Sequence, residues 1–115
     1  MQWQVVFYND ETGNEPVKDF ISNQTKGTIA EILHKFDLLI QFNVMLGLPH
    51  VRKVNKSGIR ELRIKHGSDI YRFFFFAHTG QEFILLHAIK KKKDKLSKND
   101  INLAIKRMDN YIKTH

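Results

Sequence analysis

The chain contains no cysteine and no long hydrophobic run, and both absences exclude whole classes of protein. Without cysteine, its 115 residues have no disulfide framework, no thiol nucleophile and no cysteine-ligated zinc or iron–sulfur site. The longest apolar runs, such as residues 73–77, fall far short of the roughly 20 residues that a membrane-spanning helix needs. Residues 1–4 show neither the basic nor the hydrophobic part of a secretory signal. We therefore expect a cytoplasmic protein without a membrane partner.

Motifs for nucleotide and metal chemistry are also missing. The sequence has no glycine-rich phosphate loop of the form G-x-x-x-x-G-K-[ST] or G-x-G-x-x-G, and no H-E-x-x-H pair. The six histidines do not follow a metal-ligand spacing, and the strand region lacks paired carboxylates for glycoside or two-metal chemistry. We expect neither a cofactor nor a metal. No repeat or linker divides the chain, so one domain over residues 1–115 is expected.

Positive charge is concentrated in the second half of the chain. Residues 1–49 carry three lysines against six acidic side chains, whereas residues 50–115 carry sixteen lysines and arginines against six acidic side chains. Like charges held on one part of a small domain repel one another and weaken the fold. The asymmetry therefore favours a polyanionic partner, either a nucleic acid or an acidic protein. The alternative is a basic face that serves only solubility.

The first half of the chain predicts a strand and two helices. Residues 3–8 are aromatic and β-branched, which is typical of a strand. Pro16 suits the first turn of a short helix, which Gly27 is expected to break. Thr28 and Glu31 have the spacing of a capping box that opens a second helix. The apolar stripe of that helix runs as far as the region 43–49 and comprises Ile29, Ile32, Leu33, Phe36, Leu39 and Ile40.

After residue 50 the pattern changes to strands. Residues 59–65, 70–77 and 82–89 are separated by turn-forming residues and predict an antiparallel meander. In the first of these strands, Leu62 and Ile64 are expected to face the core, with Glu61, Arg63 and Lys65 on the other face. Four consecutive phenylalanines, residues 73–76, place large rings on both faces of their strand, which should therefore be central and covered.

A final amphipathic helix follows. Ser97 and Asp100 have capping-box spacing, and Leu96 and Ile101 occupy the positions of a hydrophobic staple. The expected apolar stripe of this helix comprises Ile101, Ala104, Ile105, Met108 and Ile112.

Two groups of cations stand out among these elements. Arg63 and Arg72 lie on successive strands, and Arg72 shares its strand face with apolar residues, among them Phe74. A charge in such a place either binds an anion or is paired internally, with Glu61 or Asp69 as the available partners. The second group is the lysine-rich segment, residues 90–95, between the last strand and the last helix. Such a run is usually a solvated loop, but here it leaves the sheet that carries both arginines.

In order along the chain, the relevant motifs are Glu61-Leu62-Arg63, Tyr71-Arg72, Leu-Leu-His-Ala-Ile at 85–89, Lys91-Lys92 with Lys95, and the basic helix 101–111. Together they resemble the RelE/ParE toxin superfamily, and specifically its phage-derived HigB-like branch. The chain departs from that pattern at four positions, where Ala88, Ile89, Lys93 and Ser97 replace glycine, phenylalanine, threonine and proline.

The resemblance implies an α+β fold with the element order β-α-α-β-β-β-β-α. The expected fold is RelE-like, with a curved, mainly antiparallel sheet, an N-terminal helical hairpin and a C-terminal helix. It also implies the toxin of a type II toxin–antitoxin pair that cuts messenger RNA on the ribosome without a metal. The partners implied are the ribosome with its messenger RNA and a cognate antitoxin of the helix-turn-helix, HigA-like kind. In such a reaction the 2′-hydroxyl of the substrate attacks the phosphate, leaving a 2′,3′-cyclic phosphate and a 5′-hydroxyl.

The resemblance and the residue types together suggest roles for individual side chains. Arg63 and Arg72 supply forked donors to the phosphate oxygens, and Lys91 or Lys92 transfers protons. His87 is another acid–base candidate; strand alternation groups it with Phe83, Leu85 and Ile89, so a buried structural role is the alternative. The residues expected to grip the RNA backbone are Arg52, Lys53, Lys56, Arg60, Lys65, Lys90, Lys93 and Lys95.

Other functions are compatible with the same composition. A ParE-like member of the superfamily poisons DNA gyrase without cutting RNA. A nucleic-acid-binding module without catalytic activity accounts for the charge equally well, and a structural protein whose lysines only keep it soluble has neither binding nor toxicity. Composition alone does not rank these functions, and the resemblance places the ribonuclease first.

Overall fold

The computed structural model describes residues 3–42, 51–54, 57–90 and 97–115. Its elements are β1 (Gln4–Phe7), α1 (Pro16–Ser22), α2 (Lys26–Phe42), β2 (Val51–Lys53), β3 (Arg60–His66), β4 (Asp69–His78), β5 (Glu82–Lys90) and α3 (Lys98–Thr114). This order of helices and strands is the one expected, and the α+β class is confirmed. Within the described residues, no helix is both long and apolar enough to cross a bilayer.

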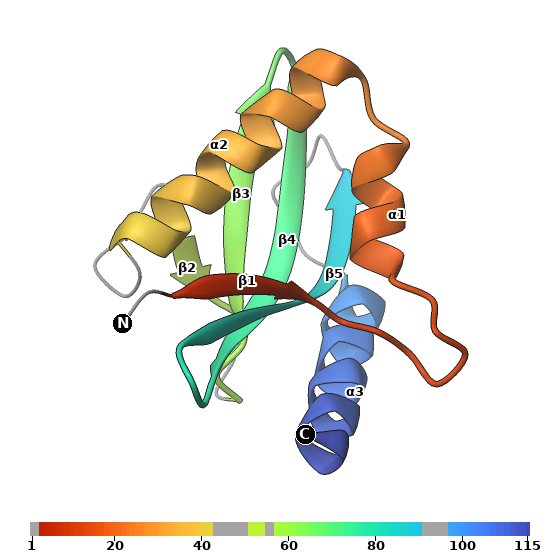
Figure 1. Ribbon diagram of the computed structural model, residues 1–115. Coiled ribbons are helices and arrows are strands. Elements are labelled where there is room, and N and C mark those ends of the chain that lie inside the picture. Colours follow the sequence, from red (N-terminus) through yellow and green to blue (C-terminus); the bar gives the residue numbers. More distant parts are fainter. Residues whose placement is uncertain (1–2, 43–50, 55–56, 91–96) are drawn as a thin grey trace.

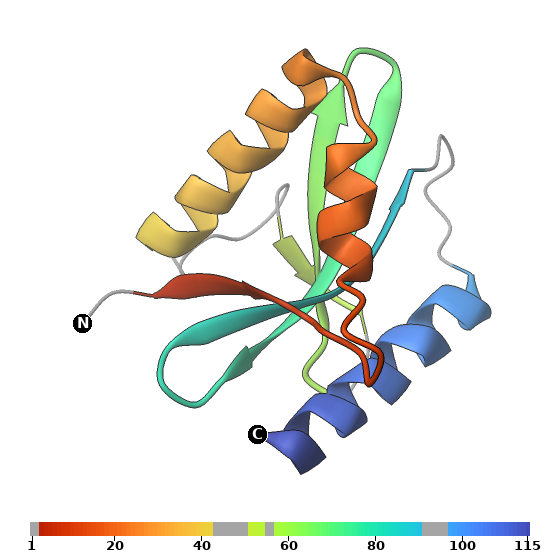
Figure 2. The same ribbon diagram turned by 45° about the vertical axis from the view of Figure 1, so that its right-hand side comes forward.

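All five strands form one curved sheet between two helical layers (Figures 1 and 2). The strand order is β1-β5-β4-β3-β2; β2 to β5 pair antiparallel, and β1 pairs parallel with β5. The three long strands form the predicted meander, with β4 in the centre. The four phenylalanines of β4, residues 73–76, are all buried, which confirms that this strand is central and covered.

The first face of the sheet, covered by α1 and α2, is apolar throughout its centre. Phe73 packs edge-on against Phe36 of α2 and Phe20 of α1, with ring centroids 5.3 and 5.9 Å apart. Leu62 and Ile64 of β3 belong to the same core, as strand alternation predicted. This face has the composition that the hydrophobic effect alone stabilises.

The second face is covered by α3 and combines apolar with charged residues. Ser97 caps α3 by accepting a hydrogen bond from the backbone N–H of Asp100, as predicted. Ala104, Met108 and Tyr111 face the sheet. Ile112, expected in the apolar stripe, is 52% exposed, because it lies one helical step beyond Tyr111, which takes the buried position. Leu96, the expected partner of Ile101 in the staple, lies outside the described residues.

The start of α2 differs from the prediction. The helix begins at Lys26, so Gly27 lies in its first turn and breaks nothing. The capping residue is Thr25, whose hydroxyl accepts from the N–H of Thr28 at 3.3 Å. The proposed box of Thr28 and Glu31 is therefore wrong by three residues, because Thr28 is buried inside the helix. Leu33 also leaves the expected stripe and is 49% exposed.

A β-bulge in β5 reverses the expected orientation of one side chain. Phe74 pairs with His87 and Phe75 pairs with Leu85, so Leu86 is an extra residue in β5. Phe83 and Leu85 face α1 and α2, whereas His87 stacks on Phe74 on the α3 face, with centroids 5.8 Å apart. The grouping of His87 with Phe83 and Leu85 is therefore wrong, since strict alternation does not account for the extra residue.

Candidate functional site

A buried ion-pair cluster lies on the α3 face of the sheet. Glu61 of β3 and Arg72 of β4 are both fully buried, and Arg72 Nη1 donates to Glu61 Oε2 at 3.2 Å. Arg52 of β2, which is cross-strand partner to Glu61, donates from Nε to Oε1 at 2.8 Å. The side chain of Arg52 is partly exposed. One carboxylate is thus shared between two guanidinium groups from neighbouring strands.

Arg63 adds a third guanidinium to this face. It lies directly opposite Arg72 in the register of β3 and β4, and it is only partly buried. Like charges directly opposite one another destabilise a sheet. Removing charges from water also costs free energy that a single ion pair does not fully return. The sheet therefore has a strongly cationic strand face, and this face lowers its stability. We call Arg52, Glu61, Arg63 and Arg72 the arginine cluster.

The remaining basic residues expected to bind RNA are divided between the two faces. Lys65 follows Arg63 by two positions, so it lies on the face of the arginine cluster. Lys53 pairs with Arg60 on the opposite face. Lys90 lies opposite Tyr71, also on that face, and its ammonium group is 3.4 Å from Asp69 Oδ2. The hydrogen bond and the charge of Asp69 raise the pKa of Lys90 above its ordinary value.

Five of the lysines predicted to act in the site lie outside the described residues. They are the two proposed for proton transfer and three of those proposed for RNA binding: Lys56, Lys91, Lys92, Lys93 and Lys95. Their roles stay predictions. The described end of β5 shows only that the lysine-rich segment begins one residue after Ile89, the partner of Arg72.

His87 belongs to a polar contact between β5 and α3, which we call the His87 clasp. Asp100 Oδ1 accepts from His87 Nε2 at 2.8 Å, and Arg107 Nη1 lies 3.5 Å from His87 Nδ1. A carboxylate accepts only and a guanidinium donates only, so neutral His87 carries its proton on Nε2. Arg107 Nη1 also donates to the carbonyl oxygen of Leu86 at 2.8 Å. Because residues 87 and 100 flank the lysine-rich segment, the clasp ties together the two ends from which that segment emerges.

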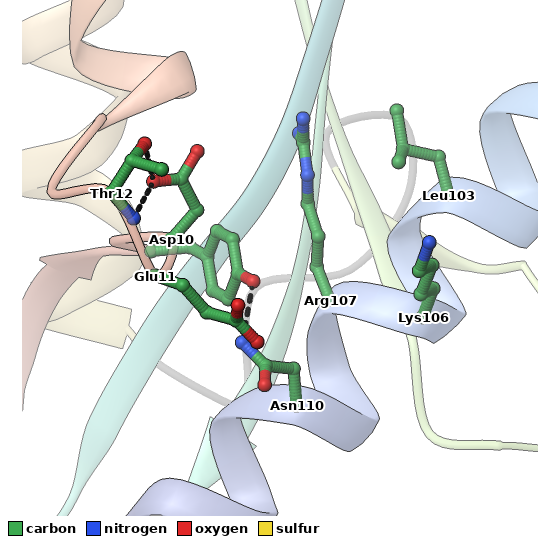
Figure 3. A pocket seen from close by; sticks show the side chains of 8 residues that line it. Asp10, Glu11, Thr12, Leu103, Lys106, Arg107 and Asn110 are labelled. Carbon is green, nitrogen blue, oxygen red and sulfur yellow. Dashed lines mark hydrogen bonds between the residues drawn. The ribbon is translucent and has the colours of Figure 1, made fainter.

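A pocket of about 400 Å³ shares Arg107 with the clasp, and Figure 3 shows the side chains that line it. Its walls come from the turn after β1 and from α3, and it is lined by Tyr8, Asp10, Glu11, Thr12, Leu103, Lys106, Arg107 and Asn110. Asn110 donates to the Tyr8 hydroxyl at 2.7 Å, and the Arg107 guanidinium lies over the Tyr8 ring, 5.7 Å from its centroid. The pocket therefore has both acidic and basic walls.

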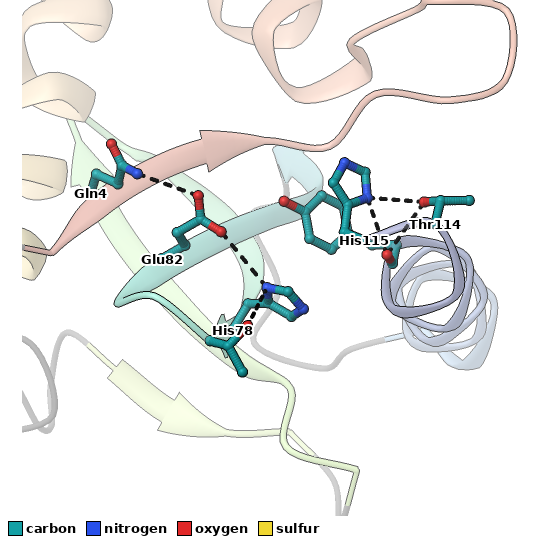
Figure 4. A network of polar contacts seen from close by, with 7 residues as sticks. Gln4, His78, Glu82, Thr114 and His115 are labelled. Carbon is teal, nitrogen blue, oxygen red and sulfur yellow. Dashed lines mark hydrogen bonds and ion pairs between the residues drawn. The ribbon is translucent and has the colours of Figure 1, made fainter.

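A further polar network lies at the far end of α3 (Figure 4). Gln4 donates to Glu82, and His78 Nδ1 is 3.7 Å from the same carboxylate. The Tyr111 ring contacts His78 edge-on and stacks on His115, with centroids 5.2 and 3.9 Å apart. This network contains no lysine or arginine and fastens the end of α3 to the sheet, so it is a structural contact rather than an anion site.

Sequence reasoning missed Asp100 as a partner of His87 and missed Arg107 altogether. A usable signal existed for Arg107. Residues 100, 104, 107 and 111 follow one another at helical spacing on a single face, so an arginine at 107 interrupts a stripe that contacts the sheet. The polar residues of the turn after β1 carried no comparable signal, because turns are polar in most proteins.

The fold and the arginine cluster together define a small α+β protein with a cationic sheet face under its C-terminal helix. The chain matches the family model of Gp49-like phage-derived proteins (DUF891) over residues 19–109, which is most of its length. It therefore belongs to that family, which is a RelE/ParE-like family of toxins in toxin–antitoxin systems. Membership implies an antitoxin as partner.

A comparison with curated proteins finds no match. Among the described residues, no three histidine, aspartate or glutamate side chains gather as a metal site would require.

Proposed function

We propose that this toxin is an endoribonuclease of the HigB-like kind that cuts messenger RNA on the ribosome without a metal. The observation that supports the proposal is the arginine cluster, in which three guanidinium groups share one face with a single buried carboxylate. Guanidinium groups match phosphate oxygens in pairs and keep their charge at every physiological pH. The cluster adjoins the strand end from which the lysine-rich segment starts.

The reaction needs three operations on one phosphodiester. The 2′-hydroxyl loses its proton to a base and attacks phosphorus, the bond to the 5′ oxygen breaks, and an acid protonates that oxygen. The products are a 2′,3′-cyclic phosphate and a 5′-hydroxyl. We propose Lys91 or Lys92 for proton transfer, because lysine is one of the side chains that act as general acids and bases.

We propose different roles for Arg63 and Arg72, because they differ in burial. Arg63 is partly exposed and is proposed to contact the non-bridging oxygens, where negative charge develops in the transition state. Arg72 is fully buried against Glu61, so direct contact with a phosphate requires a surface that it does not have. We therefore assign Arg72 a positioning role: with Glu61 it holds Arg52 and the β3 backbone that carries Arg63.

His87 is assigned a positioning role for a similar reason. Both of its ring nitrogens have protein partners, and its side chain is 14% exposed. A base must present a free nitrogen to the proton that it removes. The buried structural role, which the sequence left open, is thus the one that we propose, and through the clasp it holds the ends of the lysine-rich segment.

The proposed partner is a helix-turn-helix antitoxin of the HigA-like kind, and the proposed substrate is messenger RNA in the translating ribosome. The remaining exposed cations of the α3 face, such as Lys65, are proposed to contact RNA backbone. Phosphate contacts of this kind make binding weaken steeply as salt increases.

Mapping transcript 5′ ends after induced expression tests the proposal. Wild-type protein is expected to produce new 5′-hydroxyl ends, and Arg63→Ala to lower cleavage by roughly 100-fold or more, as loss of one charge-stabilising donor does. Arg63→Lys should recover only part of the rate, since an ammonium group lacks the forked geometry. Lys113→Ala is the matched control, because Lys113 is an exposed cation of the last turn of α3.

Short assays with purified ribosomes separate this mechanism from its rivals. Cleavage should persist in EDTA for as long as the ribosomes stay intact, which sedimentation checks. A requirement for added Mg²⁺ on naked RNA would replace the proposal with a metal-dependent nuclease. Toxicity with stabilised gyrase–DNA breaks and no new RNA ends would instead assign the chain to the ParE-like activity.

A further inference from the structure

The pocket between the turn after β1 and α3 has a chemistry that the proposed cleavage reaction leaves unused. One wall carries two carboxylates, Asp10 and Glu11, and the other carries two cations, Lys106 and Arg107 (Figure 3). Its volume of about 400 Å³ accommodates one planar base with its ribose. The question is which ligand matches both walls at once.

The acidic wall presents an acceptor held in a fixed place. Asp10 Oδ1 accepts from the N–H and the hydroxyl of Thr12 and from the N–H of Asn14, at 2.9, 2.7 and 3.0 Å. The Thr12 hydroxyl and the Asn14 N–H lower the pKa of Asp10, so it is ionised at neutral pH. Within the described chain, all hydrogen bonds to this carboxylate use Oδ1. Oδ2 is thus left for a ligand.

The basic wall presents a pair of donors. The hydrogen bonds of Arg107 to described residues, which go to Leu86 and His87, all use Nη1. The other edge of the guanidinium, formed by Nε and Nη2, is the edge that binds two acceptors side by side. Lys106, the preceding residue on α3, is exposed at the same wall.

We infer that this pocket binds one unstacked guanine base of single-stranded RNA, an inference that rests on the proposed function. Asp10 and Glu11 repel a phosphate or carboxylate ligand, and Lys106 and Arg107 repel an organic cation, so neither class of ligand suits the pocket. Guanine satisfies both walls, because its adjacent N1–H and N2–H can donate to Asp10 Oδ2 and to the Glu11 carboxylate, and its O6 and N7 accept from an arginine. Adenine, cytosine and uracil lack that pair of adjacent donors. Unstacked bases also pack well on flat guanidinium groups.

The position of the pocket connects it to the arginine cluster. Arg107 contacts His87, and His87 pairs with Phe74, which lies two residues along β4 from Arg72 on the same face. We therefore expect the RNA backbone that adjoins a guanine in the pocket to run towards the arginine cluster. The pocket supplies sequence preference, which phosphate contacts do not provide.

Binding of short RNAs to the full chain tests the inference. The probes are fluorescent 2′-O-methyl hexanucleotides, which lack the attacking hydroxyl, with one central guanine, inosine or adenine among uridines. Fluorescence anisotropy should show the guanine probe binding roughly tenfold tighter than the adenine probe. Inosine lacks the N2 amine and should lose most of that gain.

Variants then locate the preference. Asp10→Asn keeps the acceptor that holds the turn but turns the second oxygen into a donor, and it should abolish the preference for guanine over inosine. Glu11→Gln and Lys106→Gln should each reduce it. Glu15→Gln and Lys113→Gln make the same charge changes outside the pocket and should leave it intact, and melting curves establish that every variant is folded.

Equal binding of the three probes overturns the inference. So does a result in which Glu11→Gln and Lys106→Gln weaken only the complex with the cognate antitoxin, since the pocket is then a protein-binding site. These results leave the proposed function standing if new RNA ends still form. Guanine-selective binding without any new RNA ends supports the pocket and removes the nuclease.

Discussion

The two faces of the sheet bury different kinds of side chain. Towards α1 and α2, β4 presents Phe73 and Phe75 to other aromatic rings. Towards α3, the same strand presents Arg72 beside Phe74, and the neighbouring strands add Glu61 and His87. Both faces are buried, yet among the described residues the buried acidic and basic side chains, Glu61 and Arg72, lie on the second face. Buried ion pairs contribute little net stability, so we infer that the charges on the second face serve something other than stability.

This contrast separates residues that maintain the fold from residues that maintain activity. Apolar contacts are interchangeable with others of similar volume, because the hydrophobic effect has no direction. The pairing of Arg52 and Arg72 with Glu61 has direction, since each guanidinium edge is aimed at one carboxylate oxygen. Substitutions on the two faces should therefore have different consequences.

The largest effect on stability is expected from Phe73→Ala on the apolar face. Its ring packs against Phe20 and Phe36, and removing it leaves a cavity that costs about 4 kcal/mol of unfolding free energy. Urea denaturation measures the change, and Thr79→Ala in an exposed turn is the control. Cleavage per folded molecule should be unchanged. A loss of less than about 1 kcal/mol contradicts the central place given to β4.

The next effect is expected from Glu61→Ala on the charged face. This change leaves Arg72 buried without its carboxylate and should cost about 3 kcal/mol. Replacing Arg52, Glu61 and Arg72 together by methionine should restore stability to within about 1 kcal/mol of wild type, since buried ion pairs contribute little net free energy. The triple variant should nevertheless be inactive in the 5′-end assay. Full activity in a stable triple variant would show that the cluster has no part in the toxin's function.

The smallest effect on stability is expected at alkaline pH and comes from Tyr111, near the end of α3. Burial, and secondarily the charge of Glu82, raise the pKa of Tyr111 above its ordinary value of about 10. The folded state therefore holds this proton where the unfolded chain has lost it, so stability is complete below pH 10 and falls as pH rises through the raised pKa. Denaturation between pH 8 and 11 should show a steeper alkaline decline in wild type than in Tyr111→Phe. Parallel curves contradict the assignment.

Much of the fold follows from local patterns. The turns around Gly67 and Gly80, where φ is positive, separate strands in the predicted places, and the Ser97 cap begins α3 as expected. Such features depend on a few neighbouring residues, and for that reason a sequence reports them well. The start of α2 was misplaced because two threonines three residues apart both satisfy the local rule for a cap. Tertiary burial of Thr28 decided between them.

The candidate site was less predictable because its geometry depends on contacts between distant strands. The sequence identified Arg63 and Arg72 and named Glu61 as one of two carboxylates available for an internal pair. It did not decide between an exposed anion site and a buried pair, since that depends on whether a helix covers the face. His87 was placed on the wrong face because one extra residue in β5 reverses the alternation.

The sequence by itself determined the uneven charge, which is a matter of composition, and it determined the elements, their order and the central strand of phenylalanines, because these follow mainly from patterns among residues close together in the chain. Only the tertiary structure decided which cations meet, which are buried and which line the pocket with Asp10. Those outcomes follow from strand register, from a bulge at Leu86 and from the docking of α3. Each brings together residues far apart in sequence, and no local pattern records their distance.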